Sequence, residues 1–162
     1  MSVPITLFIS GLADTLLSGL DTSLALLIST AFLAPFIEEF SKIFPLYYRH
    51  GETQRSIMRL AVTVGFGFGL VELITYVAVA GVPIPFRLPG LAFHPASTAI
   101  AAYGVATRKP LPYYALAVAL HFSNNFLVVI NPLPISASII IVAVTVWIAW
   151  TLYHRTKEKF IV

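Results

Sequence analysis

The sequence predicts an all-α protein, a polytopic transmembrane helical bundle of five or six spans in one integral membrane domain, residues 1–162. One observation is composition: 58% of the residues are hydrophobic, 10% are charged and the mean hydropathy is +0.88, so most of the chain cannot face water. The other is that the apolar residues come in runs of about 20, the length that crosses a bilayer as a helix. No stretch outside these runs is long enough for a soluble domain.

The apolar runs predict spans over residues 24–48, 60–82, 87–106, 111–130 and 134–153. Within residues 1–23, the segment 4–20 either forms a sixth span or lies in the interface as an amphipathic helix, because it is barely long enough to cross and holds Asp14. The count is therefore five or six.

Prolines and glycines predict local features of these helices. Proline removes a backbone donor, so we expect Pro35 to bend its span and Pro95 to kink or break another. Small residues let membrane helices approach closely, and Gly65, Gly67 and Gly69 offer that on the span over 60–82.

Basic residues indicate the orientation. Eight of them lie in alternate connections and at the C-terminus, against Arg87 alone in the others; the eight are Arg49, Arg55, Arg59, Arg108, Lys109, Arg155, Lys157 and Lys159. Positive charge accumulates on the cytoplasmic side of a membrane. We therefore expect a multi-pass protein of the cell membrane, with residues 154–162 as a basic cytoplasmic tail.

A short set of polar residues remains inside the predicted spans: Glu38, Glu39, Lys42, Glu72, His94, His121, Asn124 and Asn125. Ionisable residues within a bilayer are costly and indicate a functional site. Helical spacing lets Lys42 pair with Glu38 or Glu39, and puts His121 and Asn125 on one face. Such a set can support hydrolysis, in which a glutamate takes a proton from water while an imidazole and an amide stabilise an oxyanion.

Other hydrolytic chemistries find no support in the sequence. The chain has no cysteine, no His-Glu-x-x-His pair and no Gly-x-Ser-x-Gly turn, and its only aspartates are Asp14 and Asp21. Three familiar classes of intramembrane protease therefore find no signal in this sequence.

Four motifs resemble a known family: Glu38-Glu39-x-x-Lys42, Phe68-x-x-x-Glu72, a histidine at His94 in the next span, and His121-x-x-x-Asn125. In this order they are similar to the PrsW-type intramembrane proteases, within the superfamily of the CAAX prenyl endopeptidases and bacteriocin-processing membrane proteases. The resemblance implies an endopeptidase that cleaves a membrane-anchored protein or peptide. Lys42 and Glu72 depart from the CAAX branch, so prenylated substrates are not expected.

The resemblance also implies roles for single residues. Glu38 would activate the attacking water and Glu39 would support it. Lys42 would hold the acidic pair, with Phe68 as a further supporting residue. Glu72 and His94 would help to place the water, and His121 and Asn125 would stabilise the oxyanion.

We expect no cofactor. Glu38, Glu72, His94 and His121 could supply nitrogen and oxygen ligands for zinc. However, the neighbouring Glu38 and Glu39 diverge by about 100° on a helix and Lys42 would repel a cation. The expected partners are the lipid bilayer and the membrane-anchored substrate, and no nucleic acid is expected. Whether the protein forms a homo-oligomer is left open.

Two other function classes remain at this point: a non-catalytic membrane binding or scaffold protein of the same superfamily, and a small proton-linked transporter, since buried Glu and His also form proton relays.

Overall fold

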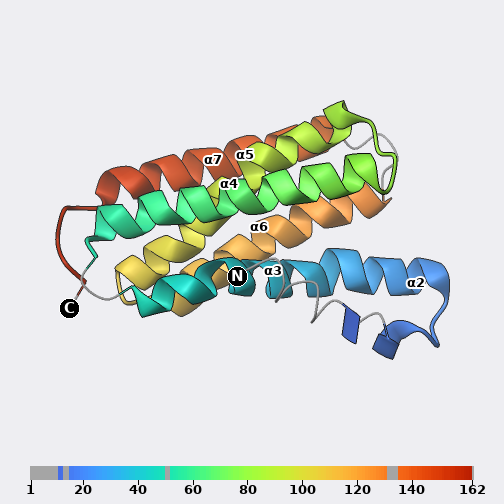
Figure 1. Ribbon diagram of the computed structural model, residues 1–162, viewed down its shortest axis with the longest axis horizontal. Helices are drawn as coiled ribbons and strands as arrows, with labels where there is room; N and C mark the ends of the chain where they lie inside the picture. The colour runs from blue at the N-terminus through green and yellow to red at the C-terminus, as the bar shows by residue number, and fades with distance from the viewer. Residues whose placement is uncertain (1–10, 13–14, 50–51, 131–134, 162) are drawn as a thin grey trace.

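The protein is a bundle of long helices (Figure 1). The structure, a computed structural model, describes residues 11–12, 15–49, 52–130 and 135–161. These residues form no β-strand, and the predicted all-α membrane bundle is confirmed. The predicted first segment, 4–20, lies largely outside the described residues.

The first long rod of the bundle is one continuous run of helical segments. It consists of α2 (Thr22–Leu26), the π-helix η1 (Leu27–Leu33), α3 (Ala34–Ile43) and the 3₁₀-helix η2 (Phe44–Tyr48). Its limits agree with the span expected over 24–48. The change from π to α geometry comes directly before Pro35, at the position where a bend was expected.

Four further helices complete the bundle: α4 (Gln54–Ala78), α5 (Ile84–Ala106), α6 (Pro110–Ile130) and α7 (Ile135–Arg155). α4 starts earlier than the predicted residue 60, because the Thr53 hydroxyl accepts a hydrogen bond from the Ser56 N–H and caps the helix. α5 continues unbroken through Pro95, so the break considered at that residue does not occur. Neighbouring helices make such prolines tolerable within a membrane bundle.

In the described part of the chain, four helical segments are long and apolar enough to cross a membrane: Thr22–Tyr48, Gln54–Ala78, Pro110–Ile130 and Ser138–Arg155. α5 is 23 residues long but is not among them. It packs against α4, α6 and α7 (Figure 1). Most of the residues in its second half are buried. A helix enclosed by protein needs fewer large apolar residues than one facing lipid, and the second half of α5 is of this kind. Whether α5 counts as a fifth span is therefore not decided by its composition, and the number of five or six spans remains a prediction.

Glycines on α4 allow it to approach α5 closely. A Cβ atom added to Gly65 would lie 2.6 Å from the Pro95 Cα, and one added to Gly69 would lie 3.2 Å from the Gly90 carbonyl oxygen. The expected close approach is therefore confirmed for Gly65 and Gly69. Gly67 faces open space and takes no part in it.

The C-terminal residues pack against the start of α4. Thr53 and Phe160 form an isolated antiparallel bridge, flanked by hydrogen bonds from the Gln54 N–H to the Lys159 carbonyl and from the Ile161 N–H to the Glu52 carbonyl, both 2.9 Å. Residues 156–161 are thus attached to the bundle at the end where α4 begins (Figure 1). That this end of the bundle faces the cytoplasm remains a prediction.

Candidate active site

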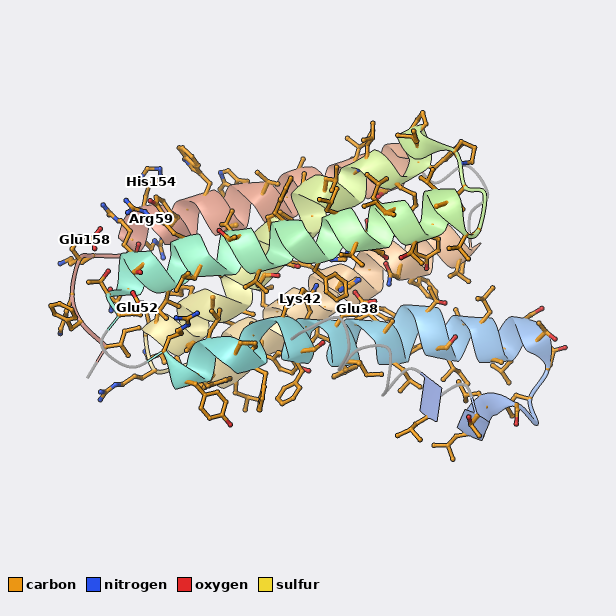
Figure 2. The ribbon with its side chains drawn as sticks, viewed as in Figure 1. Glu38, Lys42, Glu52, Arg59, His154 and Glu158 are labelled. Carbon is orange, nitrogen blue, oxygen red and sulfur yellow. The ribbon has the colours of Figure 1, made fainter. Side chains whose placement is uncertain are left out.

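The buried polar residues come from four helices that meet inside the bundle. α3 carries Glu38, Glu39 and Lys42, and the others lie on α4, α5 and α6. Figure 2 shows Glu38 and Lys42 near the middle of the length of the bundle. The labelled charges outside this group, Glu52, Arg59, His154 and Glu158, lie together at one end.

Glu39 is the centre of the hydrogen-bond network. Its side chain is fully buried, and its Oε1 accepts from Lys42 Nζ at 2.6 Å, from His121 Nδ1 at 2.8 Å and from Ser97 Oγ at 3.0 Å. An ionised carboxylate only accepts, so His121 must carry a hydrogen on Nδ1. The predicted pairing of Lys42 is found with Glu39, and a buried ion pair needs such additional donors to offset its desolvation.

Glu38 differs from its neighbour because its oxygen remains available. Its Oε2 is buried and makes no hydrogen bond to any residue that the structure describes, and the nearest charged partner among these, His121 Nε2, lies 3.8 Å away. This distance is too long for a hydrogen bond. Glu39 Oε2 is also unbonded, but the other oxygen of Glu39 is saturated. Glu38 therefore keeps its capacity to accept a proton.

Glu72 forms a second ionic group beside the first. Its Oε2 lies 2.6 Å from His94 Nε2 and its Oε1 lies 2.6 Å from Arg87 Nη2. The Arg87 guanidinium also lies 3.9 Å from the ring centre of Tyr76, in cation–π contact. Arg87 thus belongs to the same ionic network as a partly exposed member, although the sequence suggested a charge in a connection.

His94 joins the two groups. Its Nδ1 lies 3.1 Å from Lys42 Nζ, while its Nε2 contacts Glu72. An ammonium group only donates, so Nδ1 accepts and Nε2 carries the hydrogen that it gives to Glu72. Phe68 supports this arrangement, since its ring centre lies 4.8 Å from Lys42 Nζ and 5.2 Å from the His94 ring centre.

Asn125 lies apart from the gap between Glu38 and His121. Its Nδ2 donates to the Thr30 carbonyl in η1 at 3.0 Å, and its Oδ1 accepts from Asn124 at 3.4 Å. The structure therefore brings together every predicted site residue except Asn125, whose contacts are with the first rod and with its own neighbour.

A comparison with protein-family models places the chain in a known family. The family described as PrsW family intramembrane metalloprotease matches residues 1–151. The chain belongs to the PrsW family. This is the family whose motifs the sequence resembles, and it makes the chain a membrane protein of an intramembrane protease family. No curated protein and no solved structure matches the chain. The wider superfamily with the CAAX endopeptidases remains a prediction.

The word metalloprotease in the PrsW family description implies a bound metal ion. Glu38, His94 and His121 each offer a ligand atom, and these atoms lie within 4.8 Å of one another. A neutral imidazole has one lone pair for a metal. The lone pair of His94 is taken by Lys42 and its hydrogen by Glu72. An ion would have to displace one of these contacts, so the arrangement does not fit a three-ligand metal site.

Two members of the network were missed by sequence reasoning. Ser97 stands three residues after His94, on the same face of α5, and this spacing could have indicated that both reach one site. Arg87 had a weaker signal, in that three buried carboxylates faced only one predicted cation.

Proposed function

We propose that this PrsW-family protein is an intramembrane endopeptidase in which Glu38 activates the water that hydrolyses a peptide bond of a membrane-anchored protein. The observation that carries the proposal is the difference between the two neighbouring acids. The Glu39 carboxylate accepts three hydrogen bonds through Oε1, one of them from the Lys42 ammonium, although its Oε2 is unbonded. By contrast, neither oxygen of Glu38 accepts a hydrogen bond from a residue that the structure describes. A general base needs a free acceptor oxygen within the site.

In the proposed reaction, Glu38 accepts a proton from water while the water oxygen attacks the scissile carbonyl carbon. The carbonyl π electrons move to its oxygen and give a tetrahedral oxyanion. When the oxyanion collapses, the C–N bond breaks and the proton held by Glu38 passes to the departing nitrogen. The products are a new carboxyl end and a new amine.

His121 is the proposed donor to the oxyanion. It lies between two carboxylates, with Nδ1 bonded to Glu39 and Nε2 directed toward Glu38. In the imidazolium form both nitrogens carry hydrogen, so Nδ1 keeps its bond to Glu39 while Nε2 can donate to the oxyanion.

Glu72 and His94 have an indirect role in this proposal. Arg87 holds Glu72, Glu72 accepts from His94, and His94 accepts from Lys42. This chain of contacts fixes the Lys42 ammonium against Glu39. We therefore propose that Glu72 and His94 act by orienting the charged groups around the water.

The proposed reaction uses no metal. The argument is the occupied ring of His94 together with the ammonium of Lys42 beside it, since a cation close to a metal site opposes binding of the ion. The water is then activated by Glu38 alone, and the negative charge is stabilised by His121.

The test uses purified protein in lipid vesicles with a library of quenched, membrane-anchored peptides. Glu38→Gln keeps the shape of the side chain and removes the base, so we expect cleavage to fall by about 100-fold or more. The matched control is Glu158→Gln, at the end of the bundle far from the site (Figure 2), which should cleave as the wild type does. Equal cleavage by Glu38→Gln and the wild type would contradict the assignment of the base.

A further inference from the structure

The junction between η1 and α3 leaves one backbone carbonyl without a donor from its own helix. The Ala34 N–H donates to the Ser29 carbonyl, five residues earlier. Continued in this register, residue 35 would donate to the Thr30 carbonyl, but Pro35 has no N–H. In the α-helical register the donor to Thr30 would be Ala34, whose N–H is already used.

Asn125 provides the missing donor from the neighbouring helix. Its Nδ2 lies 3.0 Å from the Thr30 carbonyl oxygen. One turn earlier on α6, His121 donates to Glu39. α6 therefore holds the first rod at two points, one on each side of Pro35.

The π-helical turn matters for the site because it sets the direction of α3. A turn with one extra residue changes the rotation of everything that follows by about 100°. Loss of the π turn would rotate α3 relative to η1. Glu38 and Glu39 would then no longer point toward His121.

We infer that Asn125 is a positioning residue: by satisfying the Thr30 carbonyl that Pro35 leaves without a donor, it holds the π turn and so directs Glu38 and Glu39 toward His121. Its catalytic consequence rests on the proposed function, whereas its structural basis does not. The resemblance to the family instead implied that this amide acts directly on the oxyanion.

A double-mutant cycle on thermal unfolding tests the structural part without any substrate. Asn125→Ala should lower Tm in the wild-type background. In a Pro35→Ala background residue 35 regains its N–H, the Thr30 carbonyl no longer depends on Asn125, and most of that loss should vanish. The control is Ser123→Ala, whose hydroxyl donates to the Ala119 carbonyl within α6 itself, and whose effect on Tm should be the same in both backgrounds.

The wild type, the two single variants Asn125→Ala and Pro35→Ala, and their double variant also separate positioning from direct catalysis in the cleavage assay. A positioning role predicts that Asn125→Ala lowers kcat with little change in KM, and that this fall is much smaller in the Pro35→Ala background. A direct role on the oxyanion predicts the same fall in both backgrounds, which would overturn the inference, as would equal losses of Tm. If Asn125→Ala does not fold, Asn125→Leu, which has a similar size and no donor, goes through the same cycle.

Discussion

Removal of the buried cation Lys42 gives a prediction with a magnitude. Lys42 and Glu39 are both fully buried, and their charged atoms lie 2.6 Å apart. In Lys42→Met the carboxylate keeps its bonds from His121 and Ser97 but loses the opposite charge. Removal of one partner of a buried pair costs about 3–5 kcal/mol. For a chain of 162 residues this corresponds to a fall in Tm of about 6–20 °C.

The assay is thermal unfolding in detergent, followed by the fluorescence of the tryptophans on α7. The double variant Lys42→Met/Glu39→Gln removes both charges, so it should recover a large part of the loss. Lys159→Met is the control, because this exposed lysine is bound to the bundle through its backbone carbonyl, and its Tm should stay close to that of the wild type. A Lys42→Met protein as stable as the wild type, or a double variant no more stable than the single one, would refute the reasoning.

Three further predictions concern packing, metal content and orientation. Gly65→Ala should lower stability by about 1–3 kcal/mol, because its Cβ would meet the α5 backbone, whereas Gly67→Ala, facing open space, should be neutral or slightly stabilising; thermal unfolding compares the two. Elemental mass spectrometry of the purified protein should find much less than one zinc per chain, and chelators should leave cleavage unchanged; one zinc per chain that is lost in His121→Ala would contradict the metal-free site. Because the chain has no cysteine, an impermeant thiol reagent on intact cells should label Ala80→Cys but not Lys109→Cys, and the reverse pattern would invert the proposed orientation.

The helices and part of the site were predictable because both depend on local patterns. Apolar runs located the long helices, with the largest difference at the start of α4, which begins at Gln54 and not at residue 60. The one-turn spacing of Glu39 and Lys42 identified a pair that the structure contains. The same patterns account for the use of Gly65 and Gly69 at the contact with α5. Each of these inferences needs only one helix and the distance between its residues.

Contacts between helices were less predictable, because they depend on rotation and register that a single sequence does not contain. The Arg87 side chain reaches Glu72 because α5 begins at Ile84, whereas the sequence suggested a connection there. Asn125 was expected beside an oxyanion, but it faces Thr30, where a π turn shifts the first rod. Pro95 was considered a break, and the packing of α5 among other helices keeps it in one piece.

The close contact of Gly65 with the backbone at His94 and Pro95 has a consequence for mutational studies. Any larger residue at this position would push on the carbonyl of the histidine that links Lys42 to Glu72. In a mutational scan scored by cleavage alone, substitutions of Gly65 would therefore look like substitutions of a catalytic residue, although Gly65 has no functional group. Only a parallel measurement of protein abundance in the membrane would separate these two classes of inactive variant.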